Sequence, residues 1–158
     1  NEDMRIVGGC RVRYRILGGC WIEGLLKATP RIRRSVRGGV YTPRTADSWK
    51  ADIAAQLSGV AKGEPGEMFE IVLVYHLPRP QRWMRKKHPE GPIPCDVKPD
   101  LDNLDKAVLD AITQKGCVWR DDAQVFHKDT MKFYHAKTGT PGLHITIWGV
   151  SIDGISDD

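Results

Sequence analysis

The segment from Pro78 to Pro99 constrains the fold of this chain more than any other, because it holds six prolines. Proline has no backbone N–H and a fixed φ, so a segment this rich in proline forms neither a helix nor a central β-strand. A loop of this length within a compact domain is usually either functional or disordered. Its basic residues, set against two acidic ones, are Arg79, Arg82, Arg85, Lys86, Lys87 and Lys98. We therefore expect a long, positively charged loop here.

Regular structure is expected on both sides of this loop. The run from Phe69 to Leu77 is apolar and rich in β-branched residues, which predicts a buried central strand. The other expected elements are a helix that begins at Thr45 or Asp47 and ends near residue 58, a helix with one buried face that ends near Gly116, and strands over 125–134 and 143–148.

The first 20 residues contain a near-repeat, RIVGGC at 5–10 and RILGGC at 15–20. Two copies are too few for a repeat protein, which needs about three. We expect two short extended segments with glycine turns between them. Polar and apolar residues alternate over 11–16, which is the pattern of a half-buried strand.

Composition excludes several classes of protein. With 158 residues, 41% of them hydrophobic and 28% charged, the chain suits one globular domain rather than an intrinsically disordered protein. The longest strongly apolar run, Ile71–Tyr75, is far shorter than the roughly 20 residues that span a membrane. The N-terminus lacks the apolar stretch of a signal peptide. The four cysteines have no zinc-binding spacing, so we expect free thiols in a reducing cytoplasm.

The residues that carry chemistry lie directly after the proline-rich loop. Asp100 and Asp102 lie on one side of an extended approach to the second predicted helix, and Lys106 follows Asp102 by four positions. Residues four apart meet on one helical face, and Asp110 continues that line. The pair Asp121–Asp122 follows after a short gap. The sequence thus predicts a cluster of carboxylates beside one lysine.

Clustered carboxylates need a compensating charge. Two like charges about 4 Å apart repel by about 4 kcal/mol at an effective dielectric constant of about 20. The carboxylates therefore stay apart, take up a proton, or bind a cation between them. Oxygen ligands favour Mg²⁺ or Mn²⁺ over zinc. An EF-hand calcium loop is excluded, because its fifth, sixth and twelfth positions would be Leu104, Asp105 and Ala111.

Two interpretations of the aspartates stay open on the residues alone. In one, the aspartates cap helices and keep a turn soluble. In the other, the acidic cluster is the metal site of a nuclease, and the basic segments on either side hold the phosphate backbone. The candidate phosphate contacts are Lys27, Arg31, Arg33, Arg34 and Arg37 before the cluster, and Arg82, Arg85, Lys86, Lys87 and Lys98 in the proline-rich loop.

Two sequence blocks resemble the signature of the RusA family of Holliday-junction resolvases, which is widespread in phages and prophages. They are KPDLDNLDKAVLDAI over 98–112 and GCVWRDDAQV over 116–125. A weaker block, 28–33 with 40–43, is similar to the N-terminal loop of phage-type members. The resemblance covers about residues 22–148. It implies a RusA-like nuclease domain over 21–150, with an N-terminal extension over 1–20 and an acidic tail over 151–158.

The resemblance also implies a fold and an activity. The fold would be a small α+β domain with a mixed β-sheet flanked by helices, assembled as a homodimer. The activity would be a Mg²⁺-dependent endodeoxyribonuclease, with Mn²⁺ as a substitute, that resolves four-way DNA junctions by paired symmetric nicks. Such an enzyme would act in recombination and repair in the cytoplasm of a bacterium or a phage-infected host. By motif position Asp100, Asp102 and Asp122 would bind the metal, Lys106 would be catalytic, and Asp121 would orient water or the metal.

A phage accessory protein that binds DNA junctions without cutting them is the alternative. The chain has 24 basic and 20 acidic residues, a net charge of +4, and its positive charge is concentrated in two loops. DNA binding alone would explain that distribution. The complete set of aspartates together with Lys106 favours the nuclease.

Overall fold

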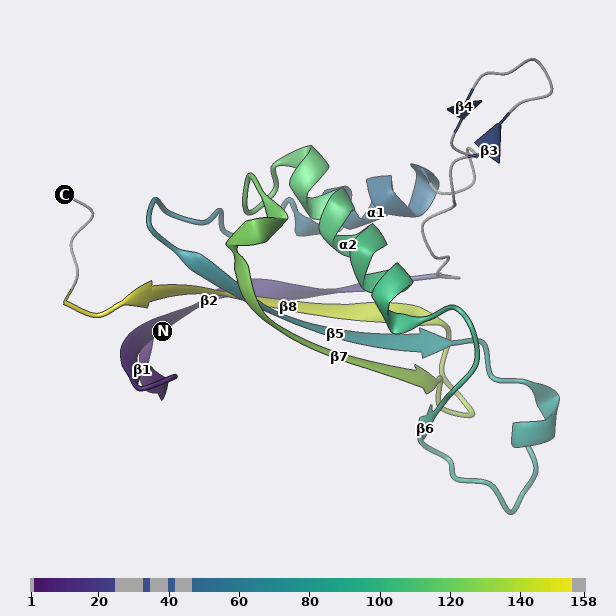
Figure 1. Ribbon diagram of the computed structural model, residues 1–158. Coiled ribbons are helices and arrows are strands. Elements are labelled where there is room, and N and C mark those ends of the chain that lie inside the picture. The colour runs from purple at the N-terminus through teal and green to yellow at the C-terminus, as the bar shows by residue number, and fades with distance from the viewer. Residues whose placement is uncertain (1, 25–32, 35–39, 42–46, 155–158) are drawn as a thin grey trace.

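The main element of the fold is a six-stranded mixed β-sheet, with strand order β1-β2-β8-β5-β7-β6 (Figure 1). The computed structural model describes residues 2–24, 33–34, 40–41 and 47–154. β5 pairs with β7 in parallel, and the other neighbouring strands are antiparallel. The strands are β1 (Glu2–Val7), β2 (Cys10–Glu23), β5 (Met68–Leu77), β6 (Ile93–Pro94), β7 (Val125–Tyr134) and β8 (Gly142–Ile152). This architecture confirms the α+β prediction, and β5 is the buried central strand expected over 69–77.

Two helices cover one face of this sheet (Figure 1). They are α1 (Asp47–Leu57) and α2 (Leu101–Lys115), close to the helices predicted from the sequence. The helix α2 ends at Gly116, whose φ of 59° is left-handed and suits glycine. None of the helices among the described residues is long and apolar enough to cross a membrane.

The main core lies between the helices and the sheet. Alternate residues of β5 are buried on the helix side, as the two-residue period of a strand requires. The core residues include Phe69, Ile71, Leu73 and Tyr75 of β5, Leu143, Ile145 and Ile147 of β8, Ile53 and Leu57 of α1, and Leu104, Val108 and Ile112 of α2.

The two GGC segments near the N-terminus have different structures. Gly8 and Gly9 have φ values of 58° and 78° and form the two-residue turn between β1 and β2. Gly18, with a φ of 140°, lies inside β2, where the pairing with β8 shifts register between Ile16 and Gly18. The expectation of a glycine turn at the second copy is therefore wrong. The extra residue there is accommodated as a β-bulge.

The hairpin of β1 and β2 belongs to the same sheet as the remaining strands. β2 pairs with β8 from Val12 to Glu23, and β8 continues to Ile152. A second, smaller buried cluster of Val12, Tyr14 and Val150 lies on the face of the sheet opposite the helices. The Arg5 guanidinium of β1 lies 4.3 Å from the centre of the Tyr14 ring, so the curled β1 covers this cluster (Figure 1).

A buried ion pair ties the hairpin to the turn before β5. The Arg15 side chain donates two hydrogen bonds to the carboxylate of Glu67, at 2.6 and 3.2 Å. Glu67 is 9% exposed and lies over Gly149 of β8. A Cβ at position 149 would stand 2.2 Å from Glu67 Oε2, so the carboxylate would have to move from its place beside Arg15.

Three predicted features fall wholly or partly outside the described residues. The basic segment 24–41 is described only at Gly24 and at a separate two-stranded pair, β3 (Arg33–Arg34) and β4 (Val40–Tyr41). Thr45, one of the two possible helix caps, and residues 155–158 of the acidic tail also lie outside them.

Candidate active site

The first half of the predicted site is the N-terminal end of α2. Asp100 is the N-cap residue: its backbone is extended, and its carbonyl accepts a hydrogen bond from Leu104 N at 3.1 Å. The Asp100 side chain makes no capping hydrogen bond, so its carboxylate stays available. Asp102 lies in the first turn, where the helix dipole stabilises a negative charge. Both residues are exposed, next to each other at the surface.

Lys106 lies one turn further along the same exposed helical face. Asp102, Lys106 and Asp110 succeed one another at intervals of four residues, as the sequence predicts. Lys106 is exposed, and among the described residues no ion pair holds its ammonium group. A lysine in this state is free to meet an incoming phosphate.

The opposite side of this turn is anchored by Asp105, which is 1% exposed. Its Oδ1 accepts hydrogen bonds from the Tyr75 hydroxyl at 2.7 Å and from Thr130 Oγ1 at 3.0 Å. Lys128 Nζ lies 3.0 Å from Oδ2 and balances the charge. Burial and the nearby Asp105 carboxylate raise the pKa of Tyr75, so its hydroxyl stays protonated and donates. Since Asp105 precedes Lys106 directly, this network fixes how the exposed face of α2 that carries Lys106 is presented.

A second anchor holds the strap of residues 95–99 that leads into α2. The Lys132 ammonium of β7 donates to the carbonyls of Val97 and Pro99, the latter at 3.1 Å. Cys95 N also donates to the Lys132 carbonyl at 3.2 Å. The backbone directly before Asp100 is thus attached to the end of β7.

The second half of the predicted site is the short 3-10 turn η3 (Asp122–Gln124) before β7. Asp121 caps this turn by accepting a hydrogen bond from Ala123 N at 2.9 Å. Gln124 Oε1 in return accepts from the backbone N–H groups of Arg120 and Asp121. This reciprocal capping occupies Asp121 and leaves the exposed Asp122 without such a role.

The two halves lie at different ends of the helix. The helix α2 begins where β5 and β7 end, whereas η3 lies where β7 begins (Figure 1). Within the described ranges, no three His, Cys, Asp or Glu side chains are grouped closely enough to hold a metal ion. The structure thus brings Asp100 and Asp102 together with Lys106, but does not bring Asp122 to them. Carboxylate oxygens are the ligands that Mg²⁺ prefers, so the donor chemistry fits even though the three-aspartate site stays a prediction.

The predicted DNA contacts are divided among three places. Residues 80–91 form a loop between β5 and β6 that we call the basic arch, and its Arg82, Arg85, Lys86 and Lys87 are all exposed. Lys98 is exposed on the strap. Arg33 and Arg34 form β3, whereas Lys27, Arg31 and Arg37 lie outside the described residues.

Comparison with known proteins decides the family. The sequence family described as Endodeoxyribonuclease RusA matches residues 24–148, which is most of the chain. The chain belongs to the RusA family. RusA-family proteins are endodeoxyribonucleases that resolve Holliday junctions, so this protein is a hydrolase that acts on branched DNA. A search of the curated proteins finds no match.

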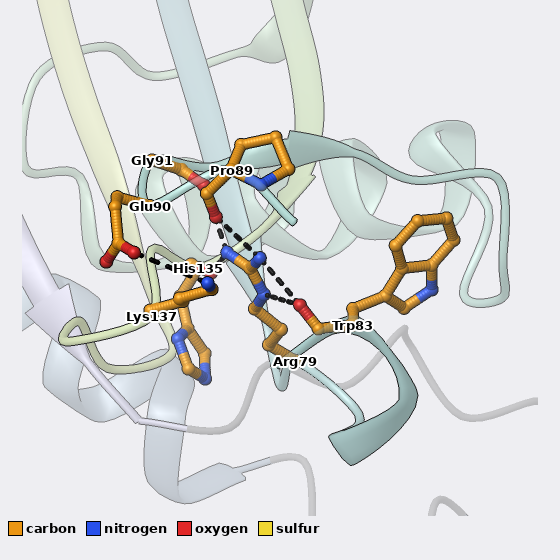
Figure 2. A network of polar contacts seen from close by, with 7 residues as sticks. All are labelled: Arg79, Trp83, Pro89, Glu90, Gly91, His135 and Lys137. Carbon is orange, nitrogen blue, oxygen red and sulfur yellow. Dashed lines mark hydrogen bonds and ion pairs between the residues drawn. The ribbon is translucent and has the colours of Figure 1, made fainter. Parts of the chain in front are cut away.

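Three residues that shape this RusA-family site are absent from the sequence-based predictions of site residues. They are Asp105, Lys132 and Arg79, the last of which organises the basic arch (Figure 2). Asp105 had a signal, because it falls on the apolar stripe of α2 between Leu104 and Val108. A charged residue at a core position must have partners. Arg79 and Lys132 had none, since their acceptors are backbone carbonyls that a sequence does not reveal.

Proposed function

We propose that this protein resolves four-way DNA junctions as a Mg²⁺-dependent homodimer, with Asp100 and Asp102 holding the metal and Lys106 binding the scissile phosphate. The observation that carries the proposal is the exposed group of Asp100, Asp102 and unpaired Lys106 at the start of α2 in a RusA-family chain. When bound, the metal would supply a water of lowered pKa and charge stabilisation at the phosphate.

Each residue of the group has a distinct part in this mechanism. Asp100 and Asp102 present carboxylates from a fixed helix end, so no loop has to be ordered before they bind. Lys106 would donate hydrogen bonds to phosphate oxygens as negative charge develops on them. Asp105 attaches the start of α2 to Tyr75 of β5, and Lys132 attaches the strap before α2 to β7. A homodimer would place two such sites on the two strands of a junction, which paired nicks require.

The first test is the substitution Asp102→Asn. It removes a charged ligand while keeping the side-chain shape, so we expect cleavage of a labelled four-way junction to fall by at least about 100-fold, as is typical of lost transition-state stabilisation. Junction binding should be retained or improved, because a negative charge near the phosphates is removed. Cleavage is measured by gel electrophoresis with Mg²⁺ and with EDTA, beside a linear duplex of matching sequence.

The matched control is Asp110→Asn, the same change two turns along the same face of α2. We expect this variant to cleave at a rate close to the wild type. Near wild-type cleavage by Asp102→Asn would refute the metal site, and equal losses in both variants would refute the assignment to the start of the helix. A substantial residual rate in EDTA would refute metal dependence.

A further inference from the structure

Arg79 is a buried arginine that pairs with no carboxylate among the described residues. It follows the end of β5 by two residues and is 7% exposed. Arginine is rarely buried without a partner, because desolvation of its charge is costly. Its partners here are all backbone carbonyl oxygens of the basic arch and its base.

The guanidinium uses every N–H donor that it has. Nε and Nη2 both donate to the Trp83 carbonyl, at 3.0 and 2.7 Å, and Nη2 also donates to the Pro89 carbonyl at 2.7 Å. Nη1 donates to the carbonyls of Gly91 and His135, at 3.0 and 3.5 Å. Arginine has five such donors in a planar fork, and all five are satisfied (Figure 2).

The acceptors come from separate points along the arch. Trp83 closes its first turn, Pro89 and Gly91 lie on its returning limb, and His135 follows the end of β7. The arch is further joined to the segment after β7, where Lys137 N donates to the Glu90 carbonyl at 2.9 Å and Lys137 Nζ lies 3.3 Å from Glu90 Oε1 (Figure 2). The Arg79 side chain thus holds the two limbs of the arch together and attaches them to the end of β7.

The Trp83 ring lies within the arch. Its centroid stands 5.2 Å from that of His88 and 6.4 Å from that of Tyr134, and its indole nitrogen is buried. This packing turns the Trp83 side chain into the arch. Arg82, Arg85, Lys86 and Lys87 are the exposed basic side chains of the arch.

We propose that Arg79 is a positioning residue for DNA binding: it holds the basic arch in one shape, so that the four exposed basic side chains meet phosphates without a prior ordering of the loop. The proposal rests on the proposed function, to which it adds the predicted phosphate contacts of the basic arch. Arg79 does not touch DNA itself, since all its donors are occupied and its side chain is buried. Pre-organisation of this kind raises affinity by lowering the entropy that binding loses.

The test compares Arg79→Lys with the double variant Lys86→Ala/Lys87→Ala. Lysine keeps the charge but has three donors and no fork, so the arch should loosen. For Arg79→Lys we expect KM for a four-way junction to rise about tenfold and kcat to stay within about twofold. The loosened arch would have to be ordered when DNA binds, which precedes the chemical step. The slope of log Kd against log salt should not change. For the double variant, which loses two phosphate contacts, the slope should fall by about 1.8.

A fall of about 0.9 in the slope for Arg79→Lys would show a direct phosphate contact and overturn the positioning role. A wild-type KM would overturn it too. If the double variant binds DNA as the wild type does, the arch does not contact DNA, and both this proposal and the DNA-binding part of the proposed function fail. The two failures are therefore distinguishable.

Limited trypsin digestion of the unliganded protein provides a second measurement, and its wild-type arm does not depend on a folded variant. Arg82, Arg85, Lys86 and Lys87 are four exposed trypsin sites, yet a fixed arch should resist cleavage there. We expect wild-type protein to be cut within residues 82–87 at least about tenfold more slowly than Arg79→Lys, since cleavage follows the population of the open loop. Rapid cleavage of the wild-type arch would overturn the proposal by itself.

Discussion

At the scale of single residues, the site depends on a buried negative charge beneath an exposed positive one. Asp105 lies in the core and Lys106 at the surface, although they are neighbours in the chain. Two hydroxyl groups and one ammonium group share the Asp105 carboxylate. Because a charged group in the core depends on each partner, loss of a single donor should be measurable in the stability of the whole domain.

Tyr75→Phe removes one of these donors and nothing else. We expect the free energy of unfolding to fall by about 1.5–3 kcal/mol, the range for a hydrogen bond to a charged group. Urea denaturation at neutral pH measures it. Tyr134→Phe is the control, because Tyr134 is also buried but its hydroxyl makes no hydrogen bond within the described residues. Equal losses in the two variants would contradict the role given to the Asp105 network.

At the scale of elements, the strap and α2 act as one unit attached to β7. Lys132 holds the strap and Lys128 the helix, and both project from the helix-facing side of β7. The carboxylates therefore depend on a strand that contributes none of them. Displacement of a catalytic group by about 1 Å can cost about 100-fold in rate, so such supports matter for chemistry.

Lys132→Met tests this support. It removes the hydrogen bonds to the strap and keeps the length of the side chain. We expect the single-turnover rate of junction cleavage to fall about tenfold, within the range for a misplaced catalytic group, with junction affinity changed less than about twofold. Lys115→Met, an equal change of charge on the exposed last turn of α2, should cleave like the wild type. Wild-type cleavage by Lys132→Met would show that the strap needs no support.

The elements that the sequence predicts best are those with a clear apolar pattern. α2 matches expectation because its apolar residues repeat about every 3.6 positions, and β5 because its run is apolar and rich in β-branched residues. The bulge at Gly18 does not follow from the repeat, since the same letters form a turn at Gly8. The spacing of Asp100, Asp102 and Lys106 places them at one helix end, where their role as a site stays a prediction. The supports from Arg79 and Lys132 could not be predicted, because their acceptors are backbone carbonyls.

At the scale of the whole molecule, the sheet carries a hydrophobic cluster on each face. The helices cover the larger one and β1 covers the smaller. The RusA match begins at residue 24, directly after β2, yet β2 forms the longest pairing with β8. The buried pair of Arg15 and Glu67 joins this hairpin to the turn before β5. The hairpin and the matched region should therefore unfold together.

Gly149→Ala tests this connection. The new Cβ would occupy the place of the Glu67 carboxylate and separate it from Arg15. We expect a loss of about 2–3 kcal/mol in the free energy of unfolding, in a single transition that fluorescence and circular dichroism report alike. In a Glu67→Ala background the same substitution should cost much less, because the clash is gone. Additive losses would contradict the proposed clash.

The way in which the arch is closed has a consequence for protein engineering. Its base is fixed by a backbone hydrogen bond, which His135 N donates to the Leu77 carbonyl at 3.0 Å. The Arg79 side chain fixes the limbs that extend from this base. The stretch between Trp83 and Pro89 contributes only two carbonyls to that closure. Its length and charge could be exchanged as a cassette while the catalytic helix stays untouched. A set of such variants on one scaffold would convert a junction nuclease into a collection of enzymes with different preferences for DNA shape.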